Sequence, residues 1–235
     1  MDVKDATHAR LLDVYRKHGK DVAVQVARKS LGMQGRNRSA EFKTNFNGEV
    51  CETVLEILVD DYCKRHPKQT AGWCWGKGII LKDPGRLDKD FTTELDFTLF
   101  TPEKIYLFEC KSYAGDKILC GAGTLERQGR EPFDVYKQSL LHVETLDKWI
   151  GRTSRSPDYQ MVLFNFSRGK VTDKRTASTK ELFPCVDETD WVTVLKGGKA
   201  VWDTKYLQHV VEVLTENSGQ LQEEHVRYVQ SLHGK

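Results

Sequence analysis

The most regular pattern of hydrophobic and polar positions lies near the middle of the chain. Apolar and polar side chains alternate from Glu94 to Phe100, which is the period-two pattern of a strand with one polar face. The run from Ile105 to Ser112 is apolar on both faces, as expected for a strand that is covered on both sides. Between the two runs, Pro102 favours the second position of a type I turn over residues 101–104. The pattern therefore predicts an antiparallel hairpin.

Symmetric pairing through this turn places Asp96 opposite Glu109 and Glu94 opposite Lys111. Side chains that lie directly opposite have Cβ atoms about 5 Å apart, where like charges destabilise a sheet. Because side chains alternate along a strand, Lys111 projects from the same face as Glu109. Buried charges are costly unless they are paired or hold a metal, so this patch suits a hard divalent cation with a positioned water.

A ladder of cross-strand salt bridges on a solvated sheet edge is the alternative explanation of these charges. The strand from Ile105 to Ser112 is apolar on both faces, which argues against an edge that faces water. Both explanations remain open from the residues alone.

The N-terminal region predicts two short helices. They cover residues 6–18 and 21–31 and end at Gly19 and Gly32. A helix–turn–helix is one interpretation of this pair, although two short amphipathic helices more often serve packing. The following stretch from Met33 to Phe46 is rich in Gly, Arg, Asn and Ser and predicts a linker or arm.

A longer helix is predicted from Glu49 to Tyr62, with Asn47 as its N-cap. Its core-facing positions include Val50, Val54, Leu55, Leu58 and Tyr62. Glu49 then lies in the first turn, where interaction with the helix dipole is a sufficient explanation for an acidic residue.

The remaining pattern adds further strands and helices. A helix is predicted from Pro132 to Ile150, with Tyr136, Leu140, Val143 and Ile150 facing inward and Gln138 and His142 sharing a second face. Strands are predicted over residues 78–82, 160–166 and 191–195, the stretch 117–130 is irregular, and the chain is helical from Lys205 onward. This order predicts an α/β fold with a mixed sheet flanked by helices.

Composition narrows the class of protein. The 235 residues are 39% hydrophobic and 30% charged, which describes a globular domain, and no apolar run approaches the roughly 20 residues of a membrane span. The polar and acidic first residues do not resemble a secretory signal. The six cysteines form no Cys-x-x-Cys pair, so we expect reduced thiols and a cytoplasmic protein without a membrane partner.

Basic residues fall in three stretches although the net charge is only +2. Such stretches are compatible with a groove that follows a phosphate backbone, and ordinary solvated surface explains each of them equally well. Their members are Arg28, Lys29, Arg36, Arg38 and Lys43; Lys64, Arg65, Lys68, Lys77 and Lys82; and Arg168, Lys170, Lys174, Arg175 and Lys180.

Four features follow one another along the chain: an acidic residue on a helix, an Asp, Glu-x-Lys on the next strand, and a helix that bears a Gln. This set resembles the PD-(D/E)xK nuclease superfamily and, more closely, its nuclease-related domain (NERD) family. The resemblance covers about half of the chain, from Asn47 to about Phe166, and the loop from Leu119 to Glu131 does not align to it. The matching segments are Gly48-Glu49, Glu94 to Phe97, Ile105 to Gly115, Pro132 to Leu146 and Met161 to Phe166.

The resemblance implies a restriction-endonuclease-like fold and a metal site. Asp96 and Glu109 would bind Mg²⁺ or Mn²⁺, helped by the backbone carbonyl of Cys110. Glu49 would complete the acidic cluster through a water or a second ion.

The same resemblance implies roles for the neighbouring residues. Lys111 would orient the attacking water and stabilise the charge that develops on the phosphate. Gln138 would orient Lys111 or touch the substrate backbone. Glu94 would pair with Lys111 or join the metal ligands, and we favour the pairing. His142 would contact phosphate, or simply pack or cap.

Two classes of function follow from these patterns. The first is a metal-dependent DNA endonuclease, for which a homodimer is compatible with the sequence. The second is a nucleic-acid-binding or scaffold module that keeps the fold without chemistry. We expect a helical N-terminal extension over residues 1–46, a nuclease-like domain over 47–204, and a C-terminal helical segment over 205–235 that packs on the domain.

Overall fold

The structure is a computed structural model that describes residues 3–31, 38–83, 85, 90–150 and 158–233. It is a mixed α/β protein, as the sequence predicted. Its contacts divide it into two units, which are described separately. The first unit is Met1–Thr70, Cys110–Asp134 and Leu163–Leu195, and the second is Ala71–Glu109, Val135–Val162 and Lys196–Lys235.

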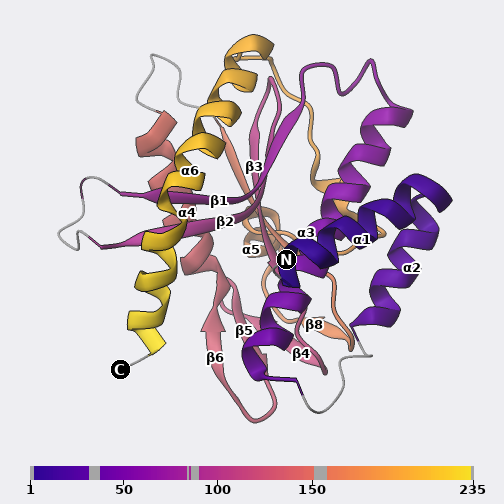
Figure 1. Ribbon diagram of the computed structural model, residues 1–235, viewed down its shortest axis with the longest axis vertical. Helices are drawn as coiled ribbons and strands as arrows, with labels where there is room; N and C mark the ends of the chain where they lie inside the picture. Colours follow the sequence, from indigo (N-terminus) through magenta and orange to yellow (C-terminus); the bar gives the residue numbers. More distant parts are fainter. Residues whose placement is uncertain (1–2, 32–37, 84, 86–89, 151–157, 234–235) are drawn as a thin grey trace. The chain divides into compact units, whose positions relative to one another are not determined.

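Three helices pack together in the first unit, α1 (Val3–His18), α2 (Lys20–Ser30) and α3 (Ala40–Arg65) (Figure 1). Gly19 separates the first two with φ +82°, a left-handed conformation that glycine adopts without steric cost. The two predicted N-terminal helices are therefore confirmed. Met33 and the other residues from 32 to 37 lie outside the described residues.

The third helix begins earlier than predicted. Ser39 is its N-cap, and the Ser39 Oγ accepts a hydrogen bond from the Phe42 backbone nitrogen at 3.1 Å. The prediction of Asn47 as the cap was wrong, and residues 40–46 of the predicted arm are helical. Phe42 and Phe46 line a small cavity together with Leu11 of α1 and Val26 of α2. Contact with these two helices therefore extends α3 through a stretch whose residues have a low intrinsic helix propensity.

The second unit contains the predicted hairpin. β1 (Cys74–Lys82), β2 (Thr92–Phe100) and β3 (Ile105–Lys111) run antiparallel in turn. The register of β2 and β3 is the predicted one, from Phe100↔Ile105 to Phe97↔Phe108. In the connection, the Thr101 backbone nitrogen donates to the Lys104 carbonyl oxygen at 3.0 Å. β3 is buried at every position except its last, which excludes a solvated sheet edge.

Two helices complete the second unit, α4 (Val135–Ile150) and α6 (Thr204–His233). α6 lies along β1 and β2. Figure 1 shows α6 in orange and yellow beside the two purple strands. Both helices contribute to one apolar core with the sheet. Its buried members are Ile79, Leu81, Leu95, Phe100, Ile105, Leu107, Leu146, Ile150, Trp202, Leu207 and Leu214. None of the described helices is long and apolar enough to cross a membrane.

The start and the buried face of α4 differ from the prediction. Pro132 does not begin the helix but lies in β6 (Arg130–Asp134), which is an edge strand. An edge strand tolerates a proline, because one side of its backbone pairs with no other strand. Leu140 is 38% exposed, so the predicted inward face was wrong at this position. The buried residues of α4 are Val135, Ser139, His142, Thr145, Leu146 and Ile150.

The stretch predicted as irregular forms a small sheet in the first unit. β4 (Lys117–Cys120), β5 (Thr124–Arg127) and β6 are antiparallel neighbours, and β8 (Val171–Asp173) pairs with β4 in parallel. The turn at Gly169 packs closely against the backbone of Gly115, because a Cβ at residue 169 would lie 2.4 Å from the Gly115 carbonyl. The prediction missed this sheet because its strands are short and one partner is distant in sequence.

The remaining elements are β7 (Tyr159–Asn165), α5 (Ala177–Leu182), β9 (Cys185–Val186) and the 3₁₀ helix η1 (Trp191–Val194). The strand predicted at residues 191–195 was wrong: these residues form η1, where Trp191 is buried with its ring edge against Tyr62. The strands make two mixed sheets, ordered β1-β2-β3-β7-β9 and β6-β5-β4-β8. All six cysteines are free thiols, as expected.

Candidate active site

Asp96 and Glu109 line the same small cavity in the second unit. The antiparallel ladder between β2 and β3 leads directly to them, since they occupy the position that follows Phe97↔Phe108. Glu109 is only 2% exposed, so its carboxylate lies away from bulk water. Thr98 of β2 and Ser139 and His142 of α4 complete the polar part of the lining.

His142 is the neighbour of Glu109 on α4. Its Nδ1 lies 3.2 Å from the Glu109 Oε2, and both side chains are at least 95% buried. A buried carboxylate is costly without a compensating partner, and the imidazole provides one. The sequence singled out His142 at i, i+4 spacing from Gln138 but did not include it among the site residues, because a histidine on the flank of a helix more often packs or caps.

Gln138 lies on α4, next in sequence to Ser139 of the cavity lining. Its Oε1 is buried and has no hydrogen-bond partner among the described residues. A buried acceptor without a donor carries a desolvation penalty of about 1–3 kcal/mol. Gln138 therefore holds an acceptor that a ligand or a water would satisfy.

Glu94 has a partner that the sequence did not predict. The His225 Nε2 on α6 lies 3.3 Å from the Glu94 Oε2, and the His225 Nδ1 lies 2.9 Å from the Thr92 Oγ1. The imidazole therefore joins two positions of β2 to the C-terminal helix. The favoured pairing of Glu94 with Lys111 stays a prediction.

Glu49 belongs to the first unit and is 4% exposed. Because α3 begins at Ala40, Glu49 lies well beyond the first turn, and the helix dipole no longer explains it. Its Oε1 accepts a hydrogen bond from the Thr53 hydroxyl at 2.9 Å, and Glu52, one turn away, is 8% exposed. α3 thus buries two neighbouring carboxylates.

Cys110 and Lys111 end β3 and also belong to the first unit. Cys110 is 6% exposed. The Lys111 ammonium lies 5.7 Å from the centre of the Phe133 ring of β6, a cation–π distance. Lys111 is thus held at the end of a buried strand beside an aromatic ring.

The donor set suits a magnesium-like ion only in part. Within the described ranges, no group of three or more His, Cys, Asp or Glu side chains is arranged to hold a metal. Mg²⁺ is commonly bound through one or two carboxylates, with waters and substrate phosphates as its other ligands. Asp96 and Glu109 offer such a pair of carboxylates, but the cavity that they line has no room for a water molecule, so a hydrated ion would enter only if the cavity widens.

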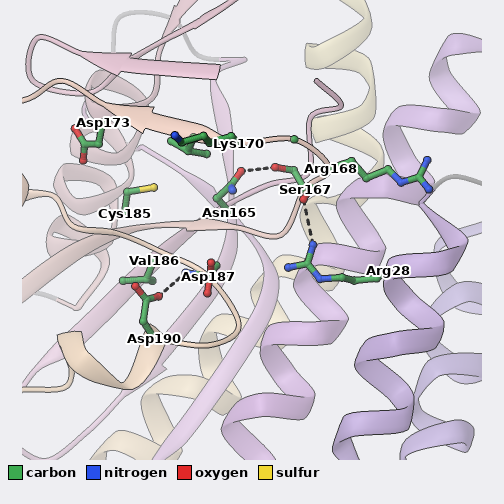
Figure 2. A pocket seen from close by; sticks show the side chains of 12 residues that line it. Arg28, Asn165, Ser167, Arg168, Lys170, Asp173, Cys185, Val186, Asp187 and Asp190 are labelled. Atoms are coloured by element: carbon green, nitrogen blue, oxygen red, sulfur yellow. Dashed lines mark hydrogen bonds between the residues drawn. The ribbon is translucent and has the colours of Figure 1, made fainter. Parts of the chain in front are cut away.

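The third basic stretch splits into exposed and structural members. Arg168 and Lys170 line a polar hollow of about 660 Å³ in the first unit, shown in Figure 2. Arg28 reaches this hollow from α2, donates to the Ser167 carbonyl at 3.2 Å and pairs with Glu188. Its charge is therefore already neutralised.

Arg175 does not contribute to a phosphate-binding surface. Its side chain is fully buried, pairs with Asp173 at 2.8 Å and donates to the Phe183 carbonyl at 2.5 Å. Asp173 and Cys185 line the hollow, and burial raises the pKa of the Cys185 thiol to about 12. Arg175 is thus a structural tie that sequence composition could not distinguish from a surface cation.

Neighbouring strands that bring two carboxylates to one cavity in a mixed α/β fold agree with a nuclease-like domain. Residues 52–165 match the family model of the nuclease-related domain (NERD), which confirms the family recognised from the sequence. The matched segment includes Asp96, Glu109, Lys111 and Gln138 and begins after Glu49. No curated protein matches the chain, and no solved structure matches it.

Proposed function

We propose that this protein is a divalent-metal-dependent nuclease, most simply a DNA endonuclease of the PD-(D/E)xK type with a restriction-endonuclease-like fold. The observation that carries the proposal is the shared cavity of Asp96 and Glu109, with Lys111 two residues further along β3. The match to a nuclease-related domain over these residues supports it.

In this proposal Asp96, Glu109 and the Cys110 carbonyl hold Mg²⁺ or Mn²⁺, and Glu49 acts through a water or a second ion. When bound, the ion would supply Lewis-acid stabilisation of the phosphate and a more acidic water. Carboxylate and carbonyl oxygens are the ligands that such hard cations prefer.

The chain's own side chains would position the reaction. Lys111 would hold the attacking water and stabilise the negative charge that develops on the phosphate oxygens. His142 would fix the orientation of Glu109 through the 3.2 Å contact. The unsatisfied Oε1 of Gln138 would orient Lys111 or accept from the substrate.

A nucleic-acid-binding module without chemistry is the second candidate. Two observations favour it: no three-residue metal cluster is preformed among the described residues. In addition, one oxygen of Glu109 is already engaged by His142. In this case, the buried charges would form a structural network only.

Incubation of the purified protein with supercoiled, linear and single-stranded DNA, and with RNA, tests the proposal. Each substrate is combined with Mg²⁺, Mn²⁺ or EDTA, and products are resolved on gels. We expect cleavage with metal, none with EDTA, and none by Asp96→Ala. The matched control is Glu216→Ala, which removes an exposed carboxylate of α6 and should cleave like wild type. Binding without cleavage by the wild type would favour the module.

A further inference from the structure

The β5–β6 hairpin holds two arginines against each other. Arg127 and Arg130 are cross-strand partners on either side of the turn at Gln128 and Gly129. Like charges that face each other across two strands destabilise the pair. Within the described part of the chain, neither arginine has an ion pair, and Arg127 instead stacks on Tyr113 at 3.8 Å with its Nε buried and unsatisfied.

Both arginines line a second hollow of the first unit, which has a volume of about 900 Å³, and a third cation, Lys117, lies in it. The Lys117 side chain is buried, and its ammonium donates to the carbonyls of Gly115 at 2.8 Å and Arg168 at 3.2 Å. No carboxylate of the described residues forms an ion pair with it, and burial lowers its pKa. A buried ammonium without a counter-charge is stabilised by any anion that enters.

The two acidic groups of this hollow are engaged elsewhere. The Asp116 carboxylate accepts from the Lys170 backbone nitrogen at 2.9 Å, and the Glu126 carboxylate lies 3.4 Å from the Cys120 thiol. Three cations against two acids leave the lining net positive. The hollow therefore favours an anion.

An exposed aromatic ring stands on the same hairpin. Phe133 of β6 is 38% exposed, pairs across the ladder with Leu125, and has the Lys111 ammonium 5.7 Å from its ring centre. Proteins that bind single-stranded nucleic acid combine cations along the backbone with aromatic rings on which bases stack. Phe133 and the arginines provide both parts within one hairpin.

We propose that the β5–β6 hairpin binds a single nucleic-acid strand, with a backbone phosphate held by Arg127, Arg130 and Lys117 and an unpaired base stacked on Phe133. This inference extends the proposed function and rests on it in one respect, because it takes the bound strand to be the substrate of the nuclease. It assigns a role to the segment from Leu119 to Glu131, which the family pattern does not explain. Stacking on Phe133 requires an unpaired base, so a single strand should bind better than a duplex of equal length.

Fluorescence anisotropy with a labelled single-stranded oligonucleotide in EDTA measures binding without any chemistry. The variant Arg130→Gln removes one exposed cation of the hairpin, and Arg227→Gln removes an exposed cation of α6 as its matched control. We expect the slope of log affinity against log salt to fall by about 1 for Arg130→Gln and to remain unchanged for the control. Equal slopes for both variants would overturn the phosphate site.

A second set of variants isolates the stacking contact. Phe133→Leu keeps an apolar side chain but removes the ring, whereas Phe133→Tyr keeps the ring and should restore binding. Base stacking contributes about 5- to 150-fold per base, so we expect at least a fivefold loss for the leucine variant. An oligonucleotide with abasic positions should bind the leucine variant and the wild type equally, and circular-dichroism melting shows whether each variant folds.

The outcomes separate this inference from the proposed function. Loss of binding by Arg130→Gln and Phe133→Leu, in a protein that cleaves nothing with metal, would support the hairpin site and reject the nuclease. Cleavage by the wild type with no change of affinity in either variant would reject the hairpin site and leave the nuclease. Equal binding of duplex and single strand, or equal loss on abasic DNA, would overturn the stacking part.

Discussion

Two hairpins of this protein place like charges on facing strands, and they do so in opposite surroundings. In the β2–β3 hairpin, Asp96 and Glu109 line a cavity in which Glu109 is 2% exposed. In the β5–β6 hairpin, Arg127 and Arg130 face each other across a turn, and all residues of β6 are exposed. The first hairpin belongs to the buried sheet, and the second to a small sheet with an open edge.

The difference lies in how each hairpin tolerates its repulsion. The Glu109 carboxylate is shielded from solvent, and the His142 imidazole at 3.2 Å compensates the cost of burying it. In the other hairpin, Arg130 relies on water and Arg127 on stacking against Tyr113. Each pair would be stabilised by a ligand of the opposite charge, a divalent cation in one case and a phosphate in the other. Facing like charges thus mark two candidate sites of complementary chemistry.

The largest expected effect tests whether the acidic hairpin is catalytic. Lys111→Ala leaves both carboxylates in place but removes the positioned cation, so we expect cleavage to fall about 10²- to 10³-fold. Metal binding should persist, and affinity for nucleic acid should change little in a gel shift. Lys199→Ala, which removes an exposed lysine, is the control. Equal cleavage by wild type and Lys111→Ala would point to a contaminating nuclease.

Stability in EDTA tests the repulsion within the acidic hairpin. Asp96→Asn should stabilise the metal-free protein by about 0.2–1 kcal/mol, because it removes one of two facing charges. Glu109→Gln should instead destabilise it, because this variant also removes the carboxylate that contacts buried His142. Urea denaturation measures both, and a shift of the same sign in the two variants contradicts the asymmetry. Added Mg²⁺ should raise the melting temperature of wild type only.

The basic hairpin should respond to the equivalent change. Arg130→Gln removes one of two facing arginines and should raise the free energy of unfolding by about 0.2–1 kcal/mol at low salt. The gain should shrink as salt screens the repulsion between the two charges. Urea denaturation at two salt concentrations measures it. A destabilised variant would mean that the two arginines do not repel each other in the folded protein.

The smallest effect concerns the pH dependence of Lys117. Burial lowers its pKa in the folded protein, so the unfolded chain binds more protons in the window below its usual value of 10.5. The cost of burying the ammonium is fully present below the lowered folded pKa and is lost as pH rises toward 10.5. Wild type should therefore gain stability relative to Lys117→Met as the pH is raised from neutral toward that value. A pH-independent difference in urea midpoints would contradict this.

The part of the fold that the sequence predicted well is local. The register of β2 and β3 follows from one alternating run, one apolar run and Pro102, and all three lie within about twenty residues of one another. Asp96 and Glu109 could be placed in one cavity for the same reason. The charge pattern of the hairpin contained the information, and no distant contact was needed to interpret it.

The parts that failed depend on contacts between distant segments. β4 pairs not only with the nearby β5 but also in parallel with β8, about fifty residues further along the chain. Pro132 gives a helix-start signal, but it lies in β6, an edge strand that pairs with β5. On α4, Leu140 was wrongly assigned to the buried face, because hydrophobic periodicity favoured it over the polar residues Ser139 and His142, which are buried instead. A buried polar site necessarily weakens the pattern that predicts burial.

The tie between Lys117 and the Arg168 carbonyl joins positions 51 residues apart in the sequence, and the missing Cβ of Gly169 lets the two turns meet. Closing such a segment costs chain entropy before any contact compensates for it, and pairings of this kind form slowly. The hairpin between β5 and β6 can form early, but the lining of its hollow is complete only after β8 has paired with β4. We therefore expect a refolding chain to acquire its acidic hairpin first and its phosphate-binding hollow late, so that a slow kinetic phase would report on the hollow alone.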